Sequence, residues 1–252
     1  MINSTSSASE YRPKDFNDMI GQDAIVKTLN NAIKNDNIPQ ALLFCGPRGV
    51  GKTSCARILA KTINNLEDDF EYNIFELDAA SNNSVEDIRN ITDQIRIPPQ
   101  TGRYKVYIID EVHMLSNQAF NAFLKSLEEP PEHVVFILAT TEKNKILPTI
   151  LSRCQIYDFK KVDNESITKL LSKICKEKKV KYEDGSLSLI AERSDGSIRD
   201  SLSIFDRLVS FTDSNLTISE VTSNLNVLDF NTYFKISELI AKKDIPGILN
   251  LY

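Results

Sequence analysis

The sequence has few of the residues that mark metal-binding, redox or nucleophile-dependent proteins. Its 252 residues include four cysteines and two histidines. The cysteines form no CxxC pair, and neither histidine belongs to an HExxH motif or a zinc-type cluster. We therefore expect reduced, mostly buried thiols, and core or surface positions for His113 and His133. No Ser/His/Asp or Cys/His arrangement typical of a nucleophilic enzyme is present.

Long apolar runs and a strong excess of charge are also missing. No run approaches the ~18 consecutive apolar residues of a membrane span. Residues 1–10 have neither the basic start nor the apolar stretch of a signal peptide, so we expect a flexible leader there, in a cytoplasmic protein. Thirty Lys and Arg against 35 Asp and Glu give a net charge of −5. This excludes a broad electrostatic DNA clamp, so any nucleic-acid contact must come from a local surface.

Short apolar runs alternate with helical patterns through the first 160 residues. The apolar runs predict five strands, at Ala41–Cys45, Asn73–Leu77, Val106–Ile109, Val134–Ala139 and Gln155–Phe159. Helical spacing occurs at Asp23–Lys34, Thr53–Ile63, Val85–Ile95 and Asn117–Glu128. The alternation predicts an α/β domain over 11–161, with a five-stranded parallel sheet covered by helices on both faces.

The pattern becomes helical after residue 161. Helices are predicted at Glu165–Lys178, Ser186–Arg193, Ser197–Ser210 and Ile218–Leu225, with no buried strand between them. We therefore expect a small all-helical domain over 162–225. A further amphipathic segment begins at Asp229, so residues 226–252 are expected to begin a third helical element that is cut short.

The strongest functional motif follows the first predicted strand and opens the next helix. The sequence GPRGVGKTS comprises Gly46, Pro47, Arg48, Gly49, Val50, Gly51, Lys52, Thr53 and Ser54 and fits the phosphate-loop pattern G-x-x-x-x-G-K-[ST]. In such a loop the backbone N–H groups surround a phosphate at a helix N-terminus. Lys52 would bind the β- and γ-phosphates, and the Thr53 hydroxyl would be a Mg²⁺ ligand. A glycine-rich turn with an incidental lysine is improbable in this context, so we predict a nucleotide site.

An acidic pair ends the third predicted strand, where ligands bind in open α/β sheets. Asp110 could hold Mg²⁺ through water, and Glu111 could orient or deprotonate the water that attacks the γ-phosphate. An Asp-Glu pair alone more often begins a helix. Downstream of an intact phosphate loop, the catalytic interpretation is favoured.

Three further positions are less decisive from spacing alone. Thr140 and Thr141 end the next strand, and a hydroxyl there could touch the γ-phosphate or only cap a loop. Arg153 and Arg199 could stabilise phosphate charge, but spacing alone favours a surface position for both.

These motifs together give the sequence a specific resemblance. YRPKDFNDMIGQ, GPRGVGKTS, ELDAAS, KVYIIDEVHMLS, PTILSRC and GSIRDSLS, in this order, resemble the AAA+ ATPases. Within them they resemble the gamma/tau subunit of bacterial DNA polymerase III, the motor of the clamp loader. The resemblance covers nearly the whole chain and identifies the helical domain over 162–225 as a lid and residues 226–252 as the start of a collar.

The resemblance implies roles that spacing could not assign. Tyr11, Arg12 and Ile20 would lie near the adenine of ATP, and Thr141 would sense the γ-phosphate. Arg199 would close the lid on the nucleotide. Arg153 would act in trans, as an arginine finger at the ATP of a neighbouring subunit. The activity implied is Mg²⁺-dependent ATP hydrolysis that loads a sliding clamp onto primed DNA.

The resemblance also implies partners and shows two departures from the family. The partners are the other clamp-loader subunits, the sliding clamp and the backbone of primer–template DNA, within a hetero-oligomer and away from any membrane. The family's four-cysteine zinc module has no counterpart in Asn64–Tyr72, so no zinc site is predicted. Because most of the collar is missing, assembly by this chain alone is left open. The family's subunits are part of DNA polymerase III, a DNA-directed DNA polymerase and therefore a nucleotidyltransferase. No residues that carry out polymerisation are expected in this chain.

A basic stretch around IRIPPQTGRYK contains the candidates for DNA contact. They are Arg89, Arg96, Arg103 and Lys105, for each of which a solvated loop position is at least as probable.

Three alternatives to a motor subunit come from different classes. A non-catalytic scaffold subunit predicts a degenerate phosphate loop, whereas Lys52 and the Asp110–Glu111 pair are intact. A helicase suggested by the DEVH string needs a second RecA-like domain, which the helical second half does not provide. A truncated domain that binds nucleotide without turnover remains open.

Overall fold

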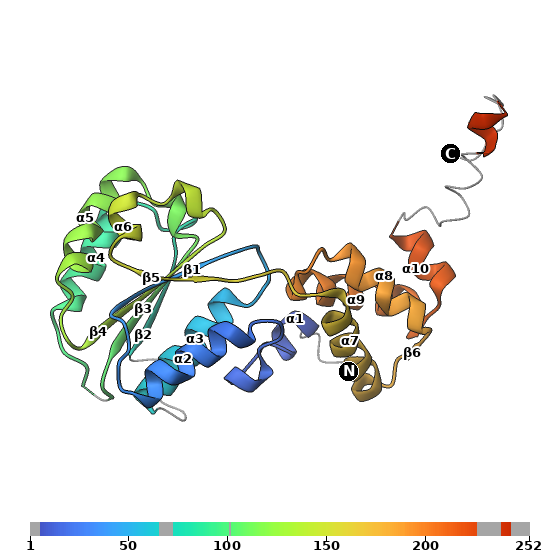
Figure 1. Cartoon of the computed structure of the whole chain (residues 1–252), viewed down its shortest axis with the longest axis horizontal. Helices are drawn as coiled ribbons and strands as arrows, with labels where there is room; N and C mark the ends of the chain where they lie inside the picture. Colours follow the sequence, from blue (N-terminus) through green and yellow to red (C-terminus); the bar gives the residue numbers. More distant parts are fainter. Residues whose placement is uncertain (1–5, 66–72, 101, 226–237, 243–252) are drawn as a thin grey trace. The chain divides into compact units, whose positions relative to one another are not determined.

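The computed structural model describes residues 6–65, 73–100, 102–225 and 238–242, which form two compact units (Figure 1). The first unit runs to Asp163 and also includes Gly196–Arg199; the second contains Asn164–Asp195 and continues from Asp200. Gly196–Arg199 joins the first unit through hydrogen bonds from Val162 N to Gly196 O, at 3.1 Å, and from Arg199 N to Gly49 O, at 3.3 Å. The expected start of a collar over 226–252 lies almost entirely outside the described residues, as does most of Asn64–Tyr72.

A single parallel sheet forms the centre of the first unit. Its strands are β1 (Ala41–Cys45), β2 (Ile74–Asp78), β3 (Lys105–Asp110), β4 (Val134–Thr140) and β5 (Gln155–Asp158). They lie side by side in the order β2-β3-β4-β1-β5, and all pairs are parallel. Every residue of β1 and β4 is buried, which is why their sequences are uninterrupted apolar runs. The predicted five-stranded parallel sheet is confirmed.

Helices cover both faces of this sheet (Figure 1). On one face, Leu42 and Phe44 pack with α2 (Asp23–Lys34) and α3 (Lys52–Asn64). On the other, Leu43 belongs to the core formed with α4 (Val85–Ile95), α5 (Asn117–Glu128) and α6 (Pro148–Leu151). Successive strand residues therefore feed opposite cores, and each large buried side chain contributes roughly 1.5–3 kcal/mol of stability.

Short helical segments occur where the expectation was a loop or leader. They are α1 (Ser7–Glu10), η1 (Phe16–Asp18), η3 (Val112–Met114) and η4 (Lys143–Lys145). The leader predicted over 1–10 differs from the structure in its second half, because α1 forms a helical turn and Ser7 is fully buried. A single polar turn has no apolar periodicity by which the sequence could announce it.

The second unit is mainly helical. It contains α7 (Asn164–Lys178), α8 (Asp184–Arg193), most of α9 (Ile198–Phe211) and α10 (Ile218–Asn224). The predicted helices are present. The prediction of an all-helical unit is wrong in one respect, because the unit also contains a short parallel strand pair, β6 (Lys181–Tyr182) with β7 (Asn215–Leu216). Strands of two residues are too short to show a repeating pattern. None of the helices that the structure describes is long and apolar enough to cross a membrane.

Candidate nucleotide-binding site

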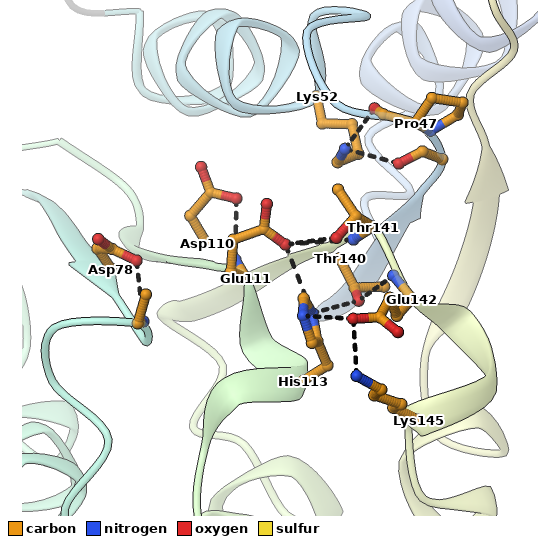
Figure 2. Close-up of polar contacts among 12 residues, drawn as sticks. Pro47, Lys52, Asp78, Asp110, Glu111, His113, Thr140, Thr141, Glu142 and Lys145 are labelled. Atoms are coloured by element: carbon orange, nitrogen blue, oxygen red, sulfur yellow. Dashed lines mark hydrogen bonds and ion pairs between the residues drawn. The ribbon is translucent and has the colours of Figure 1, made fainter.

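The phosphate loop, the acidic pair and Thr140–Thr141 meet at the carboxyl ends of three neighbouring strands. Because β4 lies between β1 and β3, the phosphate loop after β1 and the acidic pair after β3 face each other across Thr140 and Thr141 (Figure 2). This is the edge at which open α/β sheets bind ligands.

The three glycines of the phosphate loop are required by both backbone angle and space. Gly46, Gly49 and Gly51 have φ values of 145°, 75° and 99°, which favour glycine. A Cβ atom would lie 2.4 Å from Phe159 O at Gly46, 2.0 Å from Ser197 Oγ at Gly49, and 3.0 Å from Met19 Cε at Gly51. Three segments distant in sequence thus press directly on the loop backbone and fix its shape.

The remaining loop residues divide between the core and the surface. Val50 is buried in the core beside α3, and Ser54 is also buried on that helix. Arg48 is exposed. Gly51 precedes the first residue of α3, so the N-terminus of a 13-residue helix opens at the loop.

Lys52 is buried inside its own loop. Its Nζ donates hydrogen bonds of 2.7 Å to both Gly46 O and Pro47 O, and the residue is only 6% exposed. Burial lowers the pKa of Lys52, while the nearby carboxylates of Glu111 and Asp110 act in the opposite direction. The ammonium group is therefore held by exchangeable backbone partners beside the acidic pair.

The two residues predicted to hold Mg²⁺ are in direct contact. Thr53 Oγ1 donates to Asp110 Oδ2 at 2.6 Å, while Asp110 Oδ1 accepts from Glu111 N at 2.9 Å. Hydroxyl and carboxylate oxygens are the ligand type that Mg²⁺ prefers, and it commonly takes few protein ligands beside phosphates and water. Thr53 and Asp110 thus fit the metal. Among the described residues, no cluster of three or more His, Cys, Asp or Glu side chains is arranged to hold a metal ion.

Glu111 is held by the residue that follows β4. Its backbone is left-handed, with φ 47° and ψ 44°, and its side chain is 31% exposed. Its Oε2 accepts hydrogen bonds from Thr141 N at 3.3 Å and from Thr141 Oγ1 at 3.0 Å (Figure 2). Thr141 thus contacts the predicted catalytic carboxylate. From the sequence alone, a role for Thr141 at the site could not be distinguished from capping of a loop.

Met19 and Arg199 lie beside the same loop. Met19 contacts Gly51, which places Ile20 next to this contact, and Arg199 N donates to Gly49 O. Desolvation, followed by repulsion from Arg57, lowers the pKa of Arg12. Arg199 lowers this pKa further, and the Asp110 carboxylate acts in the opposite direction. Tyr11 directly follows α1.

Three residues support this site: Gln22, which the resemblance places near the adenine, and Ser197 and His113, which sequence reasoning missed. Gln22 clamps the end of β5, because its Nε2 donates to Lys160 O at 2.8 Å and its Oε1 accepts from Lys160 N at 3.3 Å. Ser197 packs on Gly49, and His113 lies between Glu111 and Glu142. Only the adjacency of Ser197 to Arg199 and of His113 to Glu111 hinted at such positions.

Arg153 is not brought to this site within the chain. Its guanidinium donates to Thr149 O at 2.6 Å and to Glu128 Oε1 at 2.7 Å. Within the described part of the chain it makes no hydrogen bond or ion pair with Lys52 or the acidic pair.

The structure separates the basic residues considered for DNA contact. Lys105 is only 8% exposed, and its Nζ donates to Gln94 O at 3.2 Å, so it caps the end of α4 and is removed from the candidates. Arg103 is exposed and paired with Asp36. Arg89 and Arg96 are exposed.

Comparison with solved structures shows the fold. Structures of RuvB from Thermotoga maritima, one titled a Holliday junction branch migration motor, superpose with a TM-score of 0.68 at 22% identity. That match covers 91% of this chain and 79% of the RuvB chain. The chain therefore shares its fold with these RuvB structures.

Two family models together cover most of the sequence. The model described as DNA polymerase III, delta subunit, matches residues 21–74 and 71–163. The model described as DNA polymerase III clamp loader subunit, ATPase lid domain, matches residues 166–214.

Similarity to curated proteins indicates which DNA polymerase III subunits this chain resembles. The chain is 46% identical to the DNA polymerase III subunit tau of Bacillus subtilis over 227 residues, 83% of this chain and 40% of that protein. It is 41% identical to subunit gamma/tau of Mycoplasma genitalium over 260 residues, 96% of this chain and 44% of that protein. The chain thus spans less than half the length of these relatives. By its phosphate loop, its fold and this identity, the chain belongs to the gamma/tau family of DNA polymerase III clamp-loader subunits.

Proposed function

We propose that this chain is an ATP-hydrolysing motor subunit of the bacterial clamp loader. It uses Mg²⁺-dependent ATP binding and hydrolysis to load the sliding clamp onto primed DNA during replication in the cytoplasm. Its partners are the other loader subunits, the clamp and the DNA backbone.

One observation carries this proposal: the phosphate-binding lysine, the two proposed Mg²⁺ ligands and the proposed catalytic carboxylate lie together at one sheet edge. Lys52 is buried beside the acidic pair, Thr53 is bonded to Asp110, and Glu111 is bonded to Thr141. A non-catalytic scaffold subunit would not need this set, so its presence favours the motor.

The residues divide the chemistry between binding and hydrolysis. Lys52 exchanges its loop carbonyls for β- and γ-phosphate oxygens, and the loop backbone surrounds the phosphates. Thr53 and Asp110 would hold Mg²⁺, which would supply neutralisation of the phosphate charge. Glu111 accepts a proton from the attacking water, and Thr141 fixes the carboxylate that receives it.

The remaining site residues are assigned by resemblance and by their location. Tyr11, Arg12 and Ile20 contact the adenine end of the nucleotide. Arg199, whose backbone already binds Gly49, senses the bound nucleotide and closes the lid.

Arg153 acts on a neighbouring subunit's ATP, and its substitution separates binding from hydrolysis. We expect Arg153→Ala to leave ATP binding by the isolated chain unchanged and to lower assembly-dependent hydrolysis strongly, since arginine fingers contribute about 10³-fold or more elsewhere. Glu128→Gln, which removes the local partner and keeps the arginine, is the matched control and should retain hydrolysis. Loss of ATP binding by the isolated Arg153→Ala chain would show that the residue acts in cis.

The deciding experiment measures ATP hydrolysis by this chain alone and then with the other loader subunits, clamp and primed DNA. The proposal requires stimulated turnover that Lys52→Ala abolishes together with ATP binding. Binding without stimulated turnover would identify a nucleotide-binding segment and overturn the motor function. No binding at all would overturn the nucleotide site.

A further inference from the structure

His113 is a buried histidine beside the proposed catalytic carboxylate. It lies in η3, two residues after Glu111, and its side chain is only 6% exposed. Figure 2 shows its ring between Glu111 and Glu142, with Thr140 alongside. The other histidine, His133, instead bonds to Ile95 O at the end of α4.

Both ring nitrogens of His113 have polar partners. Nδ1 lies 3.0 Å from Thr140 Oγ1 and 3.4 Å from Glu111 Oε2. Nε2 lies 3.3 Å from Glu142 Oε1, and Glu142 is also paired with Lys145 at 2.8 Å. The ring therefore connects the residue after β3 with the segment after β4.

The Thr140 hydroxyl is the nearest polar partner of the ring. Thr140 is fully buried, and its Oγ1 already accepts a hydrogen bond from Glu142 N at 3.0 Å. Among the described contacts, its other polar partner is His113 Nδ1, at 3.0 Å. The bond to the ring therefore completes the contacts of a buried hydroxyl, while Nε2 lies beside the Glu142 carboxylate.

This arrangement reaches Glu111 by two routes. His113 Nδ1 contacts the Glu111 carboxylate directly, and it fixes Thr140, the residue before Thr141. Thr141 in turn donates both its N–H and its hydroxyl to Glu111 Oε2. Removing the ring would leave the buried Thr140 hydroxyl without this partner and would release the strand end that holds Glu111.

We propose that His113 is a positioning residue for Glu111, which sets the orientation of the carboxylate through Thr140 and Thr141. It touches neither the phosphate loop nor Lys52 among the described contacts. It therefore acts on turnover and leaves nucleotide binding unchanged. The inference rests on the proposed ATPase function.

The test compares kcat for ATP with the Kd for a fluorescent ATP analogue in four variants, under the conditions in which the wild-type complex turns over. We expect His113→Ala to lower kcat at least about tenfold and to change Kd less than about threefold. His133→Ala, the matched control at the other histidine, should leave both unchanged. Equal losses in both alanine variants would reveal general destabilisation and overturn the proposal.

Two conservative variants separate the two sides of the ring. Asparagine places its amide at the distance of Nδ1 from the backbone, and glutamine places it near Nε2. His113→Asn should therefore recover more of kcat than His113→Gln, because the Thr140 and Glu111 side determines the rate. Equal recovery, or better recovery with glutamine, would contradict the assignment.

A double-mutant cycle tests whether the effect passes through Glu111. If it does, His113→Ala should lower the residual rate of Glu111→Gln no further, since residues acting as one unit are not additive. An additive loss would overturn the positioning role. Absence of wild-type turnover would instead refute the proposed function, so the two failures remain distinguishable.

Discussion

The two halves of the nucleotide site are built from different parts of the chain. In the phosphate-loop half, Gly46 to Thr53, the shape comes from backbone, and Lys52 is held by main-chain carbonyls. In the carboxylate half, Glu111 and its partners Thr141 and His113 form a network in which most contacts join side chains. The glycines of the phosphate-loop half leave almost no space for an added side-chain atom. In the carboxylate half, a single side-chain contact can be lost while the others remain.

This difference predicts how each half fails. A change in the loop alters both backbone conformation and packing against three distant segments, so binding and stability fall together. A change in the network removes a proton acceptor or one hydrogen bond, so turnover falls while the fold and nucleotide binding remain.

Within the two halves, the largest effect on turnover that leaves ATP binding intact is expected from the carboxylate half. Glu111→Gln keeps the size and hydrogen-bonding shape of the side chain but removes the base, so kcat should fall about 10²–10⁴-fold. ATP binding, measured by equilibrium titration, should remain close to wild type. Wild-type turnover in this variant would remove Glu111 from its role and erase the distinction between the two halves.

The next largest effect is expected from Gly49→Ala in the phosphate-loop half. The new Cβ would meet Ser197 Oγ at 2.0 Å in a backbone with φ 75°. We expect a loss of about 1–3 kcal/mol in the free energy of unfolding, measured by denaturant titration, together with weaker ATP binding. Adding Ser197→Ala removes the clashing oxygen and should recover part of the loss.

Ser197→Ala alone is the control for that double variant. The stability recovered in the double variant measures the steric clash with Ser197 Oγ. The loss of stability that remains measures the cost of an alanine in a left-handed backbone conformation. If Gly49→Ala matched wild type in stability and ATP binding, the loop would not be fixed by its neighbours.

The smallest effect is expected at Thr141, where one side-chain hydrogen bond is removed and the backbone donor stays. Thr141→Val should lower kcat about 3–10-fold, which corresponds to one hydrogen bond of ~1 kcal/mol. Thr141→Ser retains the hydroxyl and should keep most of the rate in the same steady-state assay. A valine variant that lost ATP binding instead would place Thr141 in the binding half.

Local elements were predictable where they depend on periodicity and on capping residues. The helix at Val85–Ile95 begins and ends as predicted, because its apolar spacing is regular and Ser84 caps it through Asp87 N. The strand at Ala41–Cys45 was predictable because both its faces are buried. The pair β6 and β7 was not, since two residues carry no period.

Side-chain partners were less predictable than elements. The sequence around Lys105 predicts an exposed basic stretch. In the structure, Lys105 begins β3, is buried and donates a hydrogen bond near the end of α4. Arg153 has a local partner in Glu128, 25 residues away in sequence, that no spacing rule suggested. Such contacts depend on which strands and helices become neighbours in the folded chain.

The sequence by itself determined the phosphate loop, because a backbone that surrounds phosphate requires glycine at fixed intervals between a strand and a helix. It also determined the acidic pair as its partner and the family to which both belong. Only the tertiary structure decided the order β2-β3-β4-β1-β5, which brings Thr141 and His113 to Glu111. The physical reason is that backbone conformation is set locally, whereas a side-chain network exists only after distant strands have paired.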